Sequence, residues 1–354
     1  MGKTRTKKTR TEASESSSTG ANTAAQPKVM HLALQGGGAH GAFTWGVLDR
    51  LLDEPGFSIG RISGTSAGAL NGAALASGHA LGGERGAQAA LSTLWHKVAQ
   101  TCLPFTLLSL PLRRPGLGLW DDALPLLSPL QANPLGLAPI RAALEACVDV
   151  DALRRAGAPA LFVNAVSVQT GEGRVFGPDE ISHDVLLASA CAPMMFEPVQ
   201  IGDESYWDGS YAGNPALWPL HEGVLDADIF MVELTPLRRD ELPTSPKNIL
   251  NRINEIASAA GLRNELRAIE AINRTVQDAD LRLHVVSLSE DGAAVALDPS
   301  TKRTVGIELF LALRDAGRGA CEQWLAQRSH LVGTAASTDI NRCYLDRSAR
   351  HPSA

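Results

Sequence analysis

Cysteine and aromatic residues are scarce in this chain of 354 residues. The five cysteines are widely spaced and contain no C-x-x-C pair. This spacing predicts reduced intracellular thiols, and neither a disulfide framework nor a zinc site. Aromatic residues make up only 5% of the sequence, while alanine, leucine and glycine are abundant. Such a composition favours helices packed on a sheet over an all-β sandwich.

Long apolar runs and an overall basic charge are also missing. The sequence has no run of about 18 apolar residues, the length that spans a bilayer, and no apolar signal segment precedes Val29. We therefore expect a cytoplasmic protein, with peripheral binding at a membrane or lipid surface as the open alternative. The net charge is -6, and residues 1–28 carry six basic side chains against two acidic ones. The acidic remainder argues against nucleic acid as a partner.

Strand-like and helix-like segments alternate from Val29 onward. An apolar run at 30–34 is followed by glycines and then by apolar residues at helical spacing up to Leu52. The order of strand, tight turn and helix repeats at 59–77. This alternation predicts an α/β protein whose helices cover both faces of a mostly parallel sheet. Further strands are expected at 161–168, 229–234 and 283–288, and further helices at 182–189, 249–276 and 302–327, the last broken near 317–319.

The motif Gly64-Thr65-Ser66-Ala67-Gly68 lies between the second expected strand and its helix. In that position G-x-S-x-G is typical of a nucleophile elbow, where glycines let the chain turn sharply and expose the serine hydroxyl. The N-terminus of the following helix would direct N–H groups toward the same point. An ordinary glycine-rich turn is the alternative. The buried strand before the motif favours a catalytic Ser66.

A second glycine-rich turn, Gly36-Gly37-Gly38-Ala39-His40-Gly41, follows the first strand. Its spacing also fits the dinucleotide-binding pattern G-x-G-x-x-G, which requires an acidic residue at the end of the next strand. Residues 59–63 contain no carboxylate and lead directly to Ser66. We therefore predict an oxyanion hole, because bare backbone N–H groups can approach a developing alkoxide. Its predicted members are Gly36, Gly37, Gly38 and Ala39.

The third candidate is Asp208, in the segment Trp207-Asp208-Gly209-Ser210. An Asp-Gly pair alone indicates only a turn. In chain order, however, the glycine-rich turn, the elbow and Asp208-Gly209 resemble the motifs of the patatin-like phospholipases. The segments 164–176, 187–193 and 199–215 resemble the family as well, so that the likeness covers roughly residues 29–315. The chain departs from the family at His40, which usually is Arg or Lys, and at Ser210, which usually is Gly or Ala.

The resemblance implies a three-layer α/β/α patatin-like fold and a serine lipid acyl hydrolase. In such an enzyme Ser66 is the nucleophile and Asp208 its general base, without a metal and without an organic cofactor. The motifs are completed by His40, Gly41, Gly64, Gly68 and Gly209. The implied partner is a lipid or membrane-surface substrate, and the sequence leaves the oligomeric state open.

The chain divides into three expected parts. Residues 1–28 are polar and charged, and such a segment is expected to be a disordered tail, either simply solvated or attracted to an anionic surface. Residues 29–330 form the patatin-like catalytic domain, and residues 331–354 a C-terminal extension. The stretch at about 103–137 holds thirteen leucines and six prolines. It is expected to be an irregular insertion that either packs on the core or meets lipid as a flap.

Three alternatives to this interpretation remain. In the chain order of the α/β-hydrolases, Ser66 could form a triad with Asp226 or Asp228 and with His284, although His284 lies inside an expected strand. The substrate could be another insoluble ester such as a storage polyester. The chain could also be a catalytically weak lipid-binding protein.

Overall fold

The computed structural model describes residues 1–2, 27–109, 133–235, 237, 242–289 and 304–346. The strands are β1 (Lys28–Leu34), β2 (Phe57–Thr65), β3 (Ala160–Ser167), β4 (Gly173–Phe176), β5 (Val199–Ile201), β6 (Glu204–Asp208), β7 (Asp226–Glu233) and β8 (Asp280–Ser287). The helices are α1 (Gly41–Leu51), α2 (Ala67–Ser109), α5 (Ala138–Glu145), α6 (His183–Ser189), α7 (Trp218–His221), α8 (Pro246–Thr275) and α9 (Ile307–Arg328). Two 3-10 turns, η1 (Gly38–His40) and η6 (Gly209–Tyr211), belong to the candidate site.

The eight strands of the described residues belong to one sheet, in the order β5-β6-β3-β2-β1-β7-β8, with β4 also paired to β3. The five central strands β3, β2, β1, β7 and β8 run parallel to one another. The shorter strands β4, β5 and β6 pair antiparallel. The predicted α/β class with a mostly parallel sheet is therefore confirmed.

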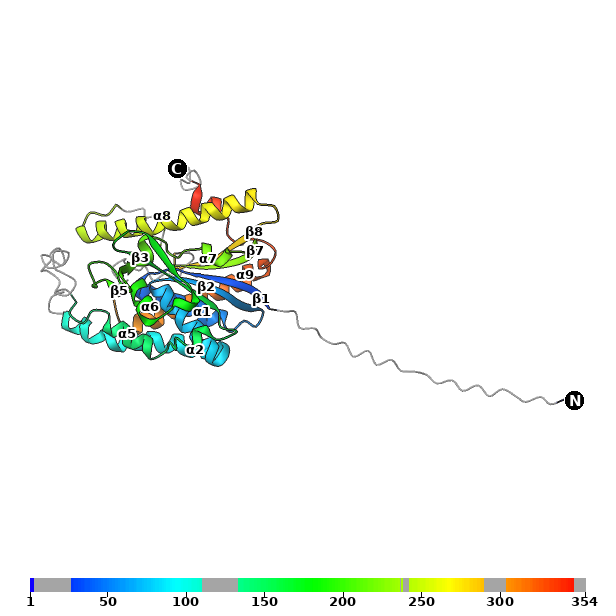
Figure 1. The fold of residues 1–354 in the computed structure, drawn as a ribbon, viewed down its shortest axis with the longest axis horizontal. Helices are drawn as coiled ribbons and strands as arrows, with labels where there is room; N and C mark the ends of the chain where they lie inside the picture. Colours follow the sequence, from blue (N-terminus) through cyan, green and yellow to red (C-terminus); the bar gives the residue numbers. More distant parts are fainter. Residues whose placement is uncertain (3–26, 110–132, 236, 238–241, 290–303, 347–354) are drawn as a thin grey trace.

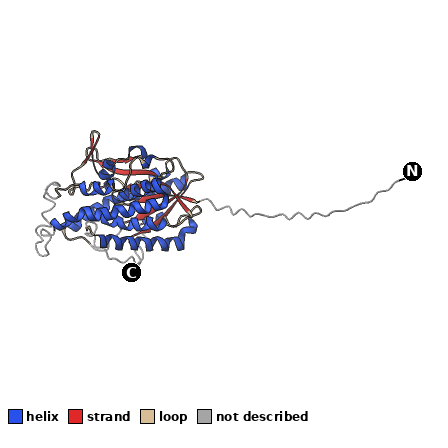
Figure 2. Ribbon diagram, turned by 90° about the horizontal axis from the view of Figure 1, so that it is seen from below, coloured by secondary structure: helices blue, strands red, loops and turns tan. Residues whose placement is uncertain are grey.

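Helices cover both faces of this sheet, which gives the predicted three layers (Figure 1). The helices α1, α2, α5, α6 and α9 enclose the larger core, whereas α7 and α8 cover the opposite face with a smaller one. Figure 2, seen from below, shows helices lying in front of most of the strands. Parallel sheets need such cover because both of their faces are apolar.

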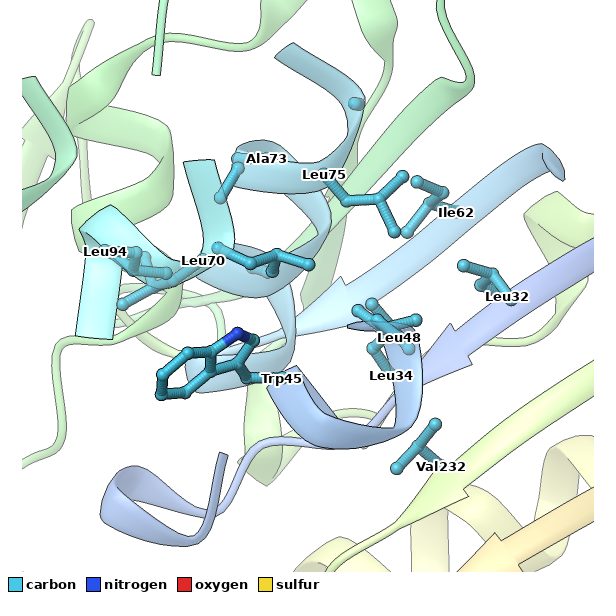
Figure 3. Packing of buried hydrophobic residues seen from close by; sticks show 14 of the residues in the cluster. Leu32, Leu34, Trp45, Leu48, Ile62, Leu70, Ala73, Leu75, Leu94 and Val232 are labelled. Atoms are coloured by element: carbon cyan, nitrogen blue, oxygen red, sulfur yellow. The ribbon is translucent and has the colours of Figure 1, made fainter. Parts of the chain in front are cut away.

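Strand β1 shows how the sequence builds the two cores. Successive side chains of a strand point to opposite faces, and Leu32 and Leu34 accordingly enter the larger core while Ala33 enters the smaller one. Figure 3 shows Leu34 beside Leu48 of α1, with Ile62 of β2 close to α2. These side chains are fully buried, so both ends of the glycine-rich turn are fixed by packing.

Glycines allow α1 and α9 to approach each other closely. A Cβ on Gly46 would lie 1.9 Å from the carbonyl oxygen of Arg314, and a Cβ on Gly317 would lie 2.1 Å from that of Phe43. The predicted helix break near 317–319 is wrong, since α9 continues from Ile307 to Arg328. The glycine signal there reflects tight packing between helices and not a turn.

Helix α2 is much longer than predicted. We expected an end near Ser77, but the helix runs to Ser109, with a kink where Gly82 and Gly83 leave helical φ/ψ values. Beyond the kink Leu91 and Leu94 are buried in the larger core. This burial stabilises the second part of the helix. The start of the predicted insertion therefore belongs to α2. Residues 110–132 of the predicted insertion lie outside the described residues, and so do residues 3–26 of the predicted tail.

The residues after α9 pack on the sheet. Thr338 donates its N–H to the carbonyl of Leu283 at 3.1 Å, and Ile340 and Tyr344 are buried in the smaller core. This segment therefore completes the cover over β8. The division of the chain into tail, catalytic domain and C-terminal extension stays a prediction.

Candidate active site

Ser66 occupies the turn between β2 and α2, at the carboxyl edge of the sheet. Its φ is +55°, a left-handed conformation that a residue other than glycine adopts only under constraint. The constraint comes from close packing, since a Cβ on Gly68 would lie 2.1 Å from the carbonyl oxygen of Leu34. A Cβ on Gly64 would likewise lie 2.7 Å from the backbone nitrogen of Ala69. The two glycines of the elbow are therefore required by the space available.

The pairing of β3 explains how Asp208 reaches this turn. Asn164 pairs with Thr65 of β2 on one edge and with β4 on the other. The next residue, Ala165, pairs with β4 and with Asp208 of β6. Strand β6 thus pairs with the same edge of β3 as β2 does, beyond the point where β2 ends at Thr65. Asp208 arrives where the elbow turns away from the sheet.

Ser66 and Asp208 are in direct contact. The Ser66 hydroxyl donates a hydrogen bond to the Asp208 carboxylate, and burial raises the pKa of this carboxyl above its ordinary range. The two residues are only 9% and 7% exposed. The Ser210 N–H donates to Asp208 Oδ1 at 2.9 Å, and the Ser210 hydroxyl also donates to the carboxylate. A buried carboxylate that prefers its protonated form is a stronger base than an exposed one.

The glycine-rich turn lies against this pair. A Cβ on Gly36 would come within 2.7 Å of the Ser66 Cβ. The N–H of Gly36 donates to Asn214 Oδ1 at 2.6 Å, and its carbonyl accepts from Asn214 Nδ2 at 3.3 Å. Asn214 therefore fixes the turn and engages one of the four predicted oxyanion donors.

The next three residues, Gly37, Gly38 and Ala39, stand at the start of the 3-10 turn η1. Their N–H groups have no acceptor within the turn itself. Those of Gly37, Gly38 and Ala39 donate to no acceptor within the described residues. Gly38 is exposed and Gly37 is half-buried, whereas Ala39 is buried. Gly38 has a φ of +58°, which explains why glycine stands there. The turn can thus present two accessible N–H donors beside Ser66.

The remaining predicted residues support these motifs by packing. His40 is buried directly before α1, and a Cβ on Gly41 would lie 2.6 Å from the Cβ of Ala67. A Cβ on Gly209 would lie 2.2 Å from the carbonyl oxygen of Asn164. The glycine-rich turn therefore packs closely against the elbow, and the Asp208 turn packs closely against β3.

Two polar residues that connect these parts were missed in the sequence. Ser189 accepts the N–H of Ser66 at 2.9 Å and donates its hydroxyl to the carbonyl of Asn164 at 2.6 Å. Asn164 Nδ2 donates to the carbonyls of Gly209 and Gly213 at 3.0 and 2.7 Å. Both residues lie in segments that carried the family resemblance, which was the only sequence signal for them. Buried polar groups that are fully hydrogen-bonded hold a site in one geometry.

His284, the histidine of the alternative triad, lies away from Ser66. Its Nε2 bonds Asp228 Oδ1 at 2.8 Å and its Nδ1 bonds the Ser337 hydroxyl at 2.9 Å. Burial opposes the ionisation of Asp228, but hydrogen bonds from His284 and Arg282 hold the pKa of Asp228 well below its ordinary range. Asp228 is paired with Met30, near the start of β1, whereas Ser66 follows the carboxyl end of β2. The geometry favours a structural role for His284.

The His284→Ala substitution should therefore separate stability from activity. We expect the free energy of unfolding to fall by about 2–4 kcal/mol, because a fully buried ring and two buried hydrogen bonds are lost. Hydrolysis of a chromogenic ester should stay within about twofold of wild type below the melting temperature. Urea unfolding and initial rates would measure both. An inactive variant of unchanged stability would restore the triad.

The described residues hold no group of three or more His, Cys, Asp or Glu side chains placed to bind a metal ion. Among the same residues no helix combines the length and the apolar character that crossing a bilayer requires.

Comparison with known proteins agrees with the motifs. The model of the patatin-like phospholipases matches residues 32–221, whereas a search of curated proteins finds no match. VipD from Legionella pneumophila is 14% identical with a TM-score of 0.40, over 90% of this chain and 73% of that one. A chain of the ExoU–SpcU complex from the type III secretion system of Pseudomonas aeruginosa is 16% identical with a TM-score of 0.37. This match covers 91% of the present chain and 56% of that chain.

The assignment rests on the family match, because it spans more than half of the chain and contains the glycine-rich turn, the elbow and Asp208-Gly209. A match of this extent carries the general activity of the family, hydrolysis of lipid acyl esters, and leaves the roles of individual residues open. This chain belongs to the patatin-like phospholipase family.

Proposed function

We propose that the protein is a serine lipid acyl hydrolase that cleaves acyl esters of phospholipids or related lipids with a Ser66–Asp208 dyad. The observation that carries this proposal is the hydrogen bond from the Ser66 hydroxyl to the buried Asp208 carboxylate. A nucleophile in contact with a base is the minimal requirement for covalent ester hydrolysis.

In the proposed first step, the Ser66 oxygen attacks the acyl carbonyl while Asp208 accepts the hydroxyl proton. Burial supports this role, because it raises the pKa of Asp208 and so strengthens it as a base. The tetrahedral intermediate collapses to an acyl-serine, and protonated Asp208 returns its proton to the departing alcohol. Water then attacks the acyl-serine with Asp208 again as base, which releases the fatty acid and restores Ser66.

The oxyanion of each intermediate would be held by the N–H groups of Gly37 and Gly38, with Ala39 next to them. We propose a different role for Gly36, whose N–H is engaged by Asn214. Donors of this kind contribute about 3–4 kcal/mol each to transition-state stabilisation in serine hydrolases. The N-terminus of α2, which begins at Ala67, adds a favourable dipole at the same place.

Exposed apolar side chains beside the site support a lipid substrate. Met194, Tyr211 and Leu135 are large and exposed, and Tyr211 lies three residues after Asp208 in the chain. Asn133 Nδ2 donates to the carbonyl of Met195 at 3.4 Å, which brings the segment of Leu135 to that of Met194. Exposed apolar surface of this kind suits acyl chains better than water-soluble esters.

The test compares substrates. The full chain is incubated with phosphatidylcholine vesicles and with granules of a storage polyester, and released acids are identified by mass spectrometry. We expect fatty acid from the vesicles, with the Ser66→Ala variant as the blank. Release only from the polyester would overturn the phospholipid assignment. Release from neither substrate, with protein of native melting temperature, would overturn the proposed hydrolase activity.

A further inference from the structure

Helix α8 presents apolar side chains on the side that faces away from the protein. Ile249, Ile253 and Ile256 are 43%, 55% and 55% exposed, and their spacing of four and three residues places them on one side of the helix. The opposite side is buried in the smaller core through Leu262 and Leu266. The three isoleucines are therefore additional to the apolar face that attaches α8 to the sheet.

The outward side of α8 continues with arginines. Arg263, Arg267 and Arg274 follow Ile249, Ile253 and Ile256 at the helical spacing of seven, four and seven residues, and so they lie on the same side. Arg267 and Arg274 are exposed and form no ion pair with a described residue. We call these six residues the outward stripe.

The three carboxylates of α8 are each engaged by another residue. Glu255 is buried beside Arg252, Glu265 accepts the N–H of Trp218 at 3.2 Å, and Glu270 accepts from Asn341 Nδ2 at 2.7 Å. Two of them lie on the side of the helix that faces the protein, whereas Glu270 shares the side of Arg267 and Arg274. The chain as a whole carries a net charge of -6, so a basic surface is unlike the average of the molecule.

Helix α8 also packs against the turn η6 that follows Asp208. Ser258 donates its hydroxyl to the carbonyl of Ser210 at 3.0 Å, and the Tyr211 hydroxyl donates to Asn254 Oδ1 at 3.1 Å. A Cβ on Gly261 would lie 2.6 Å from the carbonyl oxygen of Ala212. In Figure 1 α8 lies on the outer side of the sheet, opposite α1 and α2. The side of α8 opposite the outward stripe therefore contacts the turn that follows Asp208.

We propose that the outward stripe docks on an anionic lipid bilayer, with the isoleucines entering the headgroup region and the arginines meeting lipid phosphates. A helix face with exposed isoleucines and exposed arginines is complementary to such a surface. The inference rests on the proposed function, since docking would hold the lipid that the Ser66–Asp208 site is proposed to cleave.

The test uses the full chain with Ser66→Ala, so that lipid is not consumed, in a vesicle sedimentation assay. One variant carries Ile249→Ser, Ile253→Ser and Ile256→Ser, and a second carries Arg267→Glu and Arg274→Glu. Each arginine near an anionic surface contributes about fivefold in binding. The second variant should therefore bind vesicles containing phosphatidylserine at least about 25-fold more weakly, and the first at least about tenfold more weakly.

Matched controls separate docking from general changes of the surface. Leu81 of α2 is 53% exposed, like Ile253, and Arg155 is exposed before β3. Leu81→Ser and Arg155→Glu should leave vesicle binding unchanged. Wild-type binding by both stripe variants, with native melting temperatures, would overturn the proposal. Equal binding to vesicles with and without phosphatidylserine would also overturn it. The proposal would fail as well if the stripe bound an acidic protein but no vesicle.

The same variants with Ser66 intact distinguish docking from catalysis. Hydrolysis of a soluble chromogenic ester should be unchanged in both, because the outward stripe does not line the dyad. If wild type binds vesicles through the stripe but cleaves no ester, the proposed function fails and the docking surface stands. If ester cleavage is normal and binding ignores the stripe, the docking surface fails alone.

Discussion

The Ser66→Ala variant should lower kcat for ester hydrolysis by about 10⁵-fold or more, because loss of the nucleophile removes the covalent pathway. Labelling by a fluorophosphonate probe should disappear at the same time. Ser92→Ala is the matched control, since this serine lies on α2 outside the site, bonded to His96. The control should keep both activity and labelling.

A second substitution separates chemistry from folding. Ser66 has a φ of +55°, which glycine adopts without strain. The Ser66→Gly variant should therefore be as inactive as Ser66→Ala, with a melting temperature equal to or above that of wild type. A labelled and active Ser66→Gly protein would remove Ser66 from the proposed mechanism.

The Asp208→Asn substitution should reduce kcat by about 10² to 10⁴-fold, the range that general base catalysis contributes. Its amide oxygen can still accept the N–H of Ser210, a bond of 2.9 Å in wild type. The turn should therefore keep its shape. Near-normal hydrolysis by this variant would contradict the dyad, and the rates can be measured with a chromogenic ester.

The difference in melting temperature between Asp208→Asn and wild type should depend on pH in a defined way. Burial raises the pKa of Asp208, so the folded protein binds this proton more tightly than the unfolded chain. Stability is therefore lost as pH rises from the ordinary carboxyl pKa, about 3.9, through the higher pKa of the folded state. The asparagine variant avoids this loss, and its advantage over wild type should be larger at pH 8 than at pH 4.

The same raised pKa predicts the acid side of the wild-type activity profile. Only ionised Asp208 can accept a proton, so kcat/KM should fall on acidification, starting at a higher pH than an ordinary carboxyl would give. A profile that is flat down to pH 4 would contradict Asp208 as the base.

Much of the fold could be predicted because local sequence patterns determine it. The strands β1, β2, β7 and β8 are short apolar runs, and α6 begins after Ser182, whose hydroxyl accepts the N–H of Val185 at 3.2 Å. The length of α2 and the continuity of α9 could not be predicted. Both depend on which distant surface a glycine or an alanine packs against, and Gly317 shows this by its contact with Phe43.

The candidate site divides in the same way. The sequence by itself determined the glycine-rich turn, the elbow at Ser66 and the Asp208 turn, because each is a local motif with its own backbone requirement. Only the tertiary structure decided that β6 replaces β2 along β3 and so brings Asp208 to Ser66. It also decided that Asn214 engages Gly36, that Asp228 and Ser337 engage His284, and that the isoleucines of α8 face outward. These are contacts between residues far apart in the chain, and periodicity within a segment carries no information about its distant neighbours.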